Sequence, residues 1–455
     1  MTSMPPQALT IVGAGLGGSL LALALSRRNF QVTLCDRRPD PRLSAAERGR
    51  SINLALANRG IRALERCGVM AAVQPLLITM RGRMVHELGT GASLLPYGQG
   101  DHEVIHSVSR AALNRVLIDA AERYGVTLRF SQTCVGLDTR AGILRLRDTV
   151  AERDYEVPLA PTIGADGAGS VIRAHLAASG VAESREERLD HDYKELTVPS
   201  IGGRFALEPH ALHIWPRRGF MLIALPNLDA SFTATLFLAR EGADSFATLT
   251  SPGAVQKFFA AHFPDLIPLM PDLLEDFAQN PQGQLSTVHM SRWHDGGRVL
   301  LLGDAAHAIV PFHGQGMNAA FEDCASFEDL LDRHDRWGDL FAEFEKIRRP
   351  NTEAIAKMAL ENYVEMRDTV LDPKFRRLKS ISSELELRFP NRFVPRYSMV
   401  MFHAEISYEE ALRRGATQAA ILEELDARRT GSGEIDPALA ERLVHERLPE
   451  FAVRA

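Results

Sequence analysis

Three glycines near the start of the chain, Gly13, Gly15 and Gly18, have the spacing GxGxxG. At this spacing the first glycine permits a tight turn, the second lets the backbone approach a pyrophosphate, and the third lets a helix lie close to a strand. The free N–H groups at the start of the following helix would then bind phosphate oxygens. Asp36 lies 18 residues after Gly18, where its carboxylate could accept hydrogen bonds from ribose hydroxyls. These residues predict a dinucleotide site and leave NAD and FAD both open.

Two later motifs favour FAD. Residues 163–173 read IGADGAGSVIR and contain Asp166, and residues 302–318 read LGDAAHAIVPFHGQGMN and contain Asp304. We expect the Asp304 carboxylate to bind the ribityl hydroxyls of a flavin. The Gly-Gln-Gly run at 314–316 would open a helix whose backbone N–H groups stabilise negative charge on the pyrimidine end of a reduced flavin. Taken alone, each motif also fits a polar turn between a strand and a helix.

The segments around these motifs predict strands and helices in alternation. A strand at 9–12, a helix rich in small residues and a strand at 31–36 form a strand–helix–strand unit around the glycines. A helix after Ser109, a strand at 126–130 and a strand at 298–302 continue this α/β pattern. The chain therefore positions its motifs at the ends of strands in a largely parallel sheet.

The middle and the end of the chain read differently. Short turns join strand-like stretches at 211–215, 220–226 and 231–239, which predicts an antiparallel meander. The last hundred residues are predicted to be helical: Ser407 and Glu410 form a capping box, and Asp436 precedes a proline at a helix start.

Composition excludes several classes of protein. The chain has 455 residues and a formal net charge of −6, so no basic surface for nucleic acid is predicted. The short basic pairs Arg37-Arg38 and Arg348-Arg349 are expected on solvated faces. The four cysteines lie far apart, which predicts neither disulfides nor a metal site. The sequence lacks a signal peptide and an apolar run of ~18 residues, so we expect a cytoplasmic protein without a membrane anchor.

The three motifs, in this order, resemble those of the single-component FAD-dependent aromatic hydroxylases of the para-hydroxybenzoate hydroxylase type. Further stretches, including the C-terminal part, are similar to the kynurenine 3-monooxygenase branch of that family. These stretches are RGRSINLALANRG (48–60), RGRMVH (81–86), YKEL (193–196), PFHGQGMN (311–318), MALENYVEMR (358–367) and FVPRYSMV (393–400).

The resemblance implies an α/β fold with three parts. The first is a Rossmann-like FAD-binding domain of the glutathione-reductase type, the second an inserted antiparallel β-sheet substrate domain, and the third a C-terminal helical region. The FAD-binding domain would comprise residues 1–74, 101–180 and 285–350, the β-rich domain 75–100 and 181–284, and the helical region 351–455.

The resemblance also implies a pocket for L-kynurenine. Arg83 and Tyr97 would hold the amino-acid carboxylate, because an arginine grips a carboxylate with two donors and a phenol adds a third. Asn362 and Tyr397 would complete the polar end, and the aromatic end would be lined by Phe237, Pro311, Phe312 and His313. From the residue types alone, Arg83 also fits a surface arginine and Tyr97 a packed aromatic, and His313 has no assigned acid–base role.

The residues implied to contact FAD lie in all three motifs and around them. They are Gly13, Gly15, Leu16, Gly18, Asp36, Arg37, Arg38, Ala55, Arg110, Asp166, Asp304, Gly314, Gln315, Gly316, Met317 and Asn318. NADPH would donate electrons transiently, O₂ would be the co-substrate, and the flavin would hydroxylate ring position 3 through its C4a-hydroperoxide. No side chain is assigned a catalytic role, because the flavin would carry the chemistry.

Two alternatives remain open at this point. One is a related hydroxylase that acts on a phenolic acid, and the other is a non-catalytic FAD-binding redox sensor. The oligomeric state is also open, with a homodimer among the assemblies that fit.

Overall fold

The computed structural model describes residues 4–5, 7–43, 53–429 and 434–451. Of the stretches quoted above, residues 48–52 lie outside this description, as do the last four residues of the chain. Within the described ranges, no helix combines the length and the apolar character that crossing a bilayer requires.

A six-stranded sheet carries the dinucleotide motifs. Its order is β18-β19-β12-β1-β2-β8, and all neighbours are parallel except β18 and β19. The strands are β1 (Ala8–Val12), β2 (Gln31–Cys35), β8 (Thr127–Arg129), β12 (Thr162–Gly164), β18 (His294–Asp295) and β19 (Val299–Leu301). Because parallel strands end at one edge of a sheet, the turns after β1, β12 and β19 bring Gly13, Asp166 and Asp304 together.

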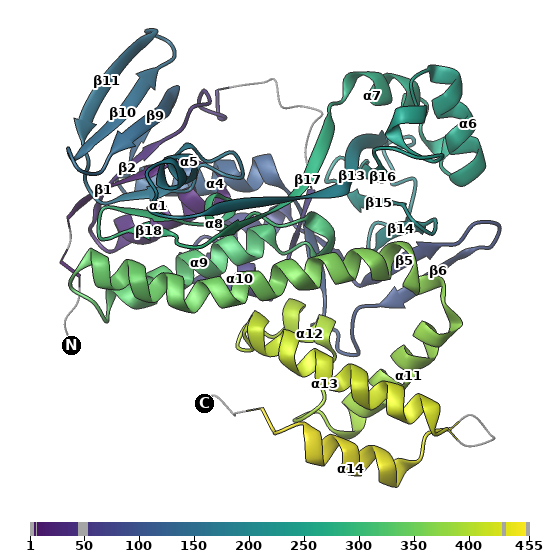
Figure 1. The fold of residues 1–455 in the computed structure, drawn as a ribbon. Helices are drawn as coiled ribbons and strands as arrows, with labels where there is room; N and C mark the ends of the chain where they lie inside the picture. The colour runs from purple at the N-terminus through teal and green to yellow at the C-terminus, as the bar shows by residue number, and fades with distance from the viewer. Residues whose placement is uncertain (1–3, 6, 44–52, 430–433, 452–455) are drawn as a thin grey trace.

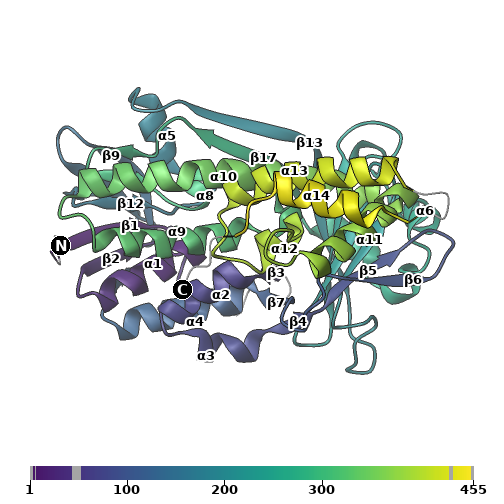
Figure 2. The ribbon, with the colours of Figure 1, turned by 90° about the horizontal axis from the view of Figure 1, so that it is seen from below.

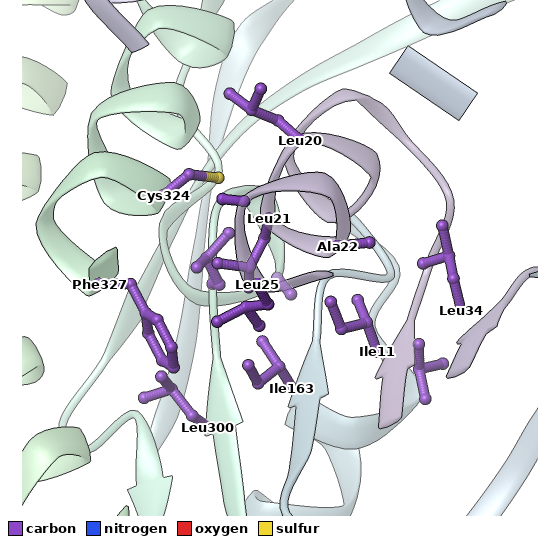
Figure 3. Close-up of a cluster of buried hydrophobic side chains, with 14 of the residues drawn as sticks. Ile11, Leu20, Leu21, Ala22, Leu25, Leu34, Ile163, Leu300, Cys324 and Phe327 are labelled. Carbon is purple, nitrogen blue, oxygen red and sulfur yellow. The ribbon is translucent and has the colours of Figure 1, made fainter. Parts of the chain in front are cut away.

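Three helices, α1 (Leu16–Arg27), α4 (Arg110–Arg123) and α9 (Gly316–Leu331), lie against this sheet, with α1 between the other two (Figures 1 and 2). The sequence of α1 is rich in Leu and Ala, which favour a helix. Figure 3 shows Leu21 and Leu25 of α1 beside Ile163 and Leu300 of the sheet. Burying one such side chain contributes about 1.5–3 kcal/mol, so this core fixes the glycine turn at the start of α1.

A seven-stranded sheet forms the β-rich part, in the order β17-β13-β16-β15-β14-β5-β6. Its neighbours are antiparallel except β5 and β14, which are parallel because β5 comes from a distant part of the chain and not through a hairpin. The strands are β5 (Gly82–His86), β6 (Ala92–Pro96), β13 (Ser184–Val198), β14 (Leu212–Pro216), β15 (Met221–Pro226), β16 (Phe232–Ala239) and β17 (Gln282–Met290). Strand β17 runs across residue 284, where we expected the β-rich domain to end. We therefore propose that the boundary between the β-rich domain and the last part of the FAD-binding domain falls after this strand.

Smaller elements connect these sheets. Two three-stranded sheets contain β3 (Asn53–Leu56), β7 (Ile105–Ser109) and β4 (Ile78–Met80), and β9 (Gln132–Asp138), β10 (Ile143–Asp148) and β11 (Arg153–Pro158). The remaining short helices are α2 (Asn58–Arg66), α3 (Met70–Val73), α5 (Val171–Ala178), α6 (Pro252–His262), α7 (Leu273–Gln279), α8 (Asp304–His307) and the single turns η1 (Gln74–Leu76), η2 (Phe246–Thr248), η3 (Ile267–Leu269), η4 (Pro311–His313) and η5 (Thr369–Leu371).

The C-terminal part is helical. Its helices are α10 (Trp337–Arg367), α11 (Pro373–Arg388), α12 (Arg396–Met401), α13 (Tyr408–Ala427) and α14 (Pro437–Arg447). The long α10 runs beside α9 and continues to the seven-stranded sheet, while α11 to α14 gather near its far end (Figures 1 and 2).

The predicted helix caps are present in part. The Ser407 hydroxyl accepts a hydrogen bond from the Glu410 N–H at 3.1 Å, and Asp436 Oδ1 accepts one from the Ala438 N–H at 2.9 Å. A capping box would also have the Glu410 carboxylate accept a hydrogen bond from the Ser407 N–H. That part of the prediction is wrong, because the carboxylate accepts from Arg413 Nη2 at 2.7 Å instead.

Candidate active site

A cavity of about 650 Å³ is lined by residues from both large sheets. This volume is in the range of cofactor and ligand sites. The residues predicted to bind FAD or substrate line this one cavity, apart from Tyr97, Gln315, Asn318 and Asn362. The lining extends from the glycine turn after β1 to Arg83 on β5, so a dinucleotide at one end would meet a substrate at the other.

The glycine motif forms the turn between β1 and α1. Gly13 has a φ of +112°, and a Cβ at this position would overlap the carbonyl of Ala165, so the turn requires glycine. A Cβ on Gly18 would overlap the Gly13 carbonyl, whereas a Cβ on Gly15 would have no atom within 4 Å. The space in front of Gly15 therefore lets a pyrophosphate reach the N–H groups at the start of α1.

Asp36 follows β2 and is buried beside this turn. Its Oδ2 accepts a hydrogen bond from the Ala14 N–H at 2.7 Å, and its Oδ1 accepts one from the Arg38 N–H at 2.8 Å. Burial alone would raise the pKa of Asp36, but the hydrogen bonds and the charge of Arg38 lower it below its ordinary value. Asp36 thus presents an ionised, fixed carboxylate, with Arg37 and Arg38 lining the same end of the cavity.

Asp166 and Asp304 line the middle of the cavity. Asp166 Oδ2 accepts a hydrogen bond from the Val171 N–H at 2.8 Å, at the start of α5. Its buried Oδ1 has no hydrogen-bond partner among the residues that the structure describes. Asp304 begins α8 and faces Gly316, where a Cβ would lie 3.9 Å from the Asp304 Oδ1. Two carboxylates, one with an unpartnered oxygen, can accept hydrogen bonds from the hydroxyl groups of a ribityl chain.

The Gly-Gln-Gly run joins η4 to α9. Gly314 has a φ of +65° and Gly316 is the first residue of α9, so the backbone can approach a flavin closely. The side chain of Gln315 points the other way: its Oε1 accepts from the Tyr408 hydroxyl at 2.7 Å, and its Nε2 donates to Met401 Sδ at 3.0 Å. Only the backbone of Gln315 can therefore contact the cavity.

The Asn318 side chain is also used within the protein. Its Nδ2 donates to the carbonyl oxygens of Ala55 and Gly314 at 2.9 Å each, and its Oδ1 accepts from the Ala57 N–H at 2.9 Å. The structure thus gives Asn318 the role of tying the loop at 314 to β3, a role that the motif spacing did not reveal.

A buried charge network lies behind the Asp304 turn. Asp323 Oδ2 accepts from the Gly303 N–H at 3.0 Å and from His307 Nε2 at 2.7 Å, and its Oδ1 accepts from Arg348 Nε at 2.7 Å. Burial would raise the pKa of Asp323, but His307 and Arg348 lower it overall. The prediction that Arg348 lies on a solvated face is wrong: its side chain is buried because Glu322 and Asp323 on α9 face α10.

Arg83 forms the polar end of the cavity. It lies on β5 and is buried, with Nη1 3.1 Å from Glu365 Oε1 and Nη2 3.4 Å from Asn362 Oδ1. Its Nε has no partner among the described residues. Its guanidinium stacks over the Tyr397 ring at 4.6 Å. A fixed guanidinium with an unused N–H can bind an incoming carboxylate.

Aromatic rings surround this guanidinium. The Tyr397 ring stacks on Tyr97 at 5.6 Å and on His313 at 5.3 Å between ring centres. Burial raises the pKa of both tyrosines, so their hydroxyls stay protonated and act as donors. Burial, together with the charges of Arg83 and other arginines, lowers the pKa of His313 to about 3, so this histidine is neutral at physiological pH.

Apolar rings and strands form the other wall. Phe237 of β16 meets Phe312 edge-on at 4.9 Å, and Phe312 stacks on Tyr363 at 3.8 Å. Asn362 does not line the cavity; its Nδ2 donates to the Phe312 carbonyl at 2.7 Å while its Oδ1 holds Arg83. Asn362 therefore connects the polar end to the aromatic end.

Two residues at this end escaped the sequence reasoning, Glu365 and Tyr363. Both belong to the ENYVEM stretch on α10. Glu365 is three residues after Asn362, so helical spacing places Asn362 and Glu365 on one face of the helix. That spacing is a signal that could have identified Glu365 as a partner of Arg83. Within the described ranges, no group of three or more His, Cys, Asp or Glu is placed to hold a metal ion.

Comparison with known proteins agrees with this geometry. Residues 7–357 match the family model described as FAD binding domain. The kynurenine 3-monooxygenase of Xanthomonas oryzae pv. oryzae (strain MAFF 311018) is 47% identical over 449 residues, which is 98% of each chain. That of Xanthomonas campestris pv. campestris (strain 8004) is 47% identical over 444 residues, which is 97% of each chain.

Solved structures share the fold at lower identity. The tetrameric form of 2-methyl-3-hydroxypyridine-5-carboxylic acid oxygenase superposes with a TM-score of 0.65 at 20% identity and covers 81% of this chain and 94% of its own. PqsL of Pseudomonas aeruginosa, solved in complex with 2-aminobenzoylacetate, has a TM-score of 0.59 at 21% identity, and the match covers 79% of this chain and 96% of the PqsL chain. With near-full-length relatives at 47% identity and an FAD-binding domain match over residues 7–357, the chain belongs to the FAD-dependent kynurenine 3-monooxygenase family.

Proposed function

We propose that this protein hydroxylates L-kynurenine at ring position 3 to give 3-hydroxy-L-kynurenine, with NADPH as electron donor and O₂ as co-substrate. The observation that carries the proposal is the clamp of Arg83, Tyr97 and Tyr397 at the far end of a cavity whose near end fits FAD. Its substrate-binding residues are Arg83, Tyr97, Asn362, Tyr397, Phe237, Pro311, Phe312 and His313, to which we add Glu365.

The clamp would bind the amino-acid end of the substrate. The Arg83 guanidinium and the protonated Tyr397 hydroxyl line the cavity and are hydrogen-bond donors for a carboxylate, while Tyr97 packs on the Tyr397 ring outside the lining and holds it in place. Glu365 already pairs with Arg83 at 3.1 Å, so it adds a negative charge beside the site of an α-ammonium group. A substrate with both charges on one carbon matches this arrangement.

The aromatic wall would orient the ring. Phe237 and Phe312 supply apolar faces that exclude water and hold an arene in one plane. When bound, FAD supplies the redox chemistry by accepting hydride from NADPH and activating O₂. The amino group of kynurenine already donates electron density to ring position 3, so the residues around it need not remove a proton. Neutral, buried His313 agrees with this, since it is a poor general base.

We also propose the cytoplasm as the location. Cys35, Cys67, Cys134 and Cys324 are all free and buried, which suits a reducing compartment. Fractionation of cells that express the tagged protein tests this, and recovery in the membrane pellet would contradict it.

One assay tests the activity. The FAD-loaded protein is given NADPH in air, and NADPH consumption and 3-hydroxykynurenine formation are followed with and without L-kynurenine. We expect product only with kynurenine, and a matching rise in NADPH consumption. Turnover of hydroxybenzoates but not kynurenine would point to the phenolic-acid hydroxylase, and bound FAD without turnover of either would point to a redox sensor.

A further inference from the structure

The flavin-facing loop, residues 314–316, is tied to the C-terminal helices by two buried hydrogen bonds of the Gln315 side chain, one to Tyr408 and one to Met401 Sδ. Gln315, the middle residue of that loop, and Tyr408, the first residue of α13, are both fully buried. The Tyr408 hydroxyl donates to Gln315 Oε1 at 2.7 Å. The two residues are 93 positions apart in the sequence, so the bond joins parts that local folding does not bring together.

Arg59 of α2 holds Tyr408 in place. Its guanidinium lies 4.0 Å from the centre of the Tyr408 ring, a cation–π geometry. The same guanidinium donates to the carbonyl oxygens of Val400 in α12, at 3.3 Å, and of Ile406 between α12 and α13. These contacts fix the start of α13 against α2, which follows the predicted FAD contact Ala55.

The charge of Arg59 is balanced within the same buried cluster. Arg59 Nη1 donates to Glu322 Oε1 at 2.5 Å, and Arg348 Nη1 donates to Glu322 Oε2 at 2.7 Å. Burial would raise the pKa of Glu322, but the two arginines lower it overall. Glu322 lies on α9, the helix that follows the flavin-facing loop in the chain. A buried ion pair adds little net stability compared with an apolar pair, but these pairs connect α2, α9 and α10 through specific contacts.

We propose that Tyr408 is a positioning residue for the flavin: it fixes the Gln315 side chain, and thereby aims the backbone N–H groups of residues 314–316 at the pyrimidine end of the bound isoalloxazine. Tyr408 itself lines neither the flavin cavity nor the substrate end. This inference rests on the proposed flavin site but not on kynurenine as substrate.

The variant Tyr408→Phe tests this, because it removes only the hydroxyl and leaves the ring under Arg59. Gln315 Oε1 is then buried without a partner, and the side chain keeps only its weaker hydrogen bond from Nε2 to Met401 Sδ, so the loop is restrained less. We expect a more negative midpoint potential of the bound flavin, since misplaced N–H donors stabilise the reduced form less. We also expect about tenfold slower reduction by NADPH, with the KM for L-kynurenine changed less than about twofold, since Tyr408 does not contact the substrate.

Tyr155→Phe is the matched control. Tyr155 also donates its hydroxyl to a glutamine, Gln132 Oε1, at 2.7 Å, but Gln132 lines the cavity at the Asp36 end, where its N–H donates to the Asp36 carbonyl, and not at the loop of residues 314–316. We expect this variant to keep the wild-type flavin potential. An equal shift in both variants, or no shift in Tyr408→Phe, would overturn the proposal.

A double variant separates positioning from stability. Tyr408→Phe with Gln315→Leu removes both partners, so no polar group is left buried and unpaired, and the melting temperature is expected to recover toward wild type. The potential should nevertheless stay shifted, because the restraint on the loop is still absent. Recovery of the potential together with the melting temperature would mean that Tyr408 has only a structural role. These measurements need FAD alone, so they remain decisive even if the wild-type protein does not hydroxylate kynurenine.

Discussion

At the scale of single residues, the site depends on a few charged side chains whose neighbours decide their state. Asp36 is ionised because Arg38 and the Ala14 N–H bind its oxygens, and Arg83 is held by Glu365 and Asn362. His313 is neutral because it is buried near several arginines. The neighbours of Arg83 are distant in sequence and Arg38 is close to Asp36, but in each case the folded geometry sets the state, so residue type alone did not give it.

Arg83→Ala should weaken substrate binding and leave the flavin in place. The variant loses charged hydrogen bonds worth about 2–3 kcal/mol, which corresponds to a KM for L-kynurenine higher by about 30- to 150-fold. Steady-state kinetics and the absorbance of bound FAD measure the two effects. Arg81→Ala is the control, because Arg81 is an exposed arginine two residues earlier, and it should keep the wild-type KM. A normal KM for Arg83→Ala would remove this residue from the clamp.

Asp304→Ala should weaken FAD binding. If the carboxylate at the start of α8 binds the ribityl chain as we propose, its loss removes those hydrogen bonds, and we expect the Kd for FAD to rise by about 10- to 100-fold. Titration of the apoprotein with FAD, followed by flavin fluorescence, measures this. The exposed Asp335 supplies the control Asp335→Ala, which should bind FAD as the wild type does. Full FAD loading of Asp304→Ala at low FAD concentration would contradict the assignment.

At the scale of elements, the C-terminal helices contribute to the site through their ends. The start of α13 contacts the flavin-facing loop, and α12 carries Tyr397 into the clamp. Helix α11 contacts the segment after β6, where Gln99 Nε2 donates to the Ser383 carbonyl at 2.8 Å. These helices therefore supply Tyr397 to the cavity lining and pack against the loop at 314–316.

The contact of α11 should loosen as pH rises. Burial, and then repulsion by Glu103, raises the pKa of Glu386 to about 7. Because this pKa is above the ordinary value of 4.5, the stability that neutral Glu386 contributes is complete below pH 4.5 and is lost as pH rises through about 7. Glu386→Gln keeps the neutral form, so its Tm should exceed that of the wild type at about pH 8 and equal it near pH 4.5. Glu384→Gln, on the exposed side of α11, should show no such difference, and equal melting curves for Glu386→Gln and wild type at both pH values would contradict the shift.

The cap of α14 gives a purely structural prediction. Asp436 Oδ1 accepts from the N–H groups of Ala438 and Leu439, so Asp436→Ala should lower the free energy of unfolding by about 1 kcal/mol. Urea denaturation measures the change, and the exposed Glu446→Ala on the same helix is the control. The KM for L-kynurenine should stay the same, because α14 does not line the cavity.

At the scale of the whole molecule, local patterns could be predicted and distant pairings could not. The glycine turn, the Asp166 and Asp304 turns and the strands of the meander depend on neighbouring residues, and the structure has them where the spacing placed them. The pair Arg59–Glu322 joins residues 263 positions apart, and no sequence period connects such partners; the pair Arg83–Glu365, 282 positions apart, could be inferred only through the helical spacing of Glu365 from Asn362. For the same reason Arg348 was expected in solvent: the two carboxylates that bury it lie on another helix.

Removal of FAD should lower the stability of the whole chain. The cavity is lined by residues from both large sheets and from α9, so a ligand in it contacts both parts at once. FAD at about 100 times its Kd should stabilise the folded state by about 2.7 kcal/mol and raise the Tm by a few degrees. Thermal melts of apoprotein with increasing FAD measure this, and Asp304→Ala should need more FAD for the same rise. A Tm that does not depend on FAD would argue against a site between these sheets.

The pairing of Arg83 with Glu365 has a consequence for selectivity. Because Glu365 lies 3.1 Å from the Arg83 guanidinium, the Arg83–Glu365 pair by itself carries no net charge. A simple aromatic acid would bring one uncompensated negative charge into a buried space, which is unfavourable. A zwitterion brings its own counter-charge and leaves the clamp electrically neutral. The clamp would thus reject hydroxybenzoates through charge balance, even where their rings fit the aromatic wall.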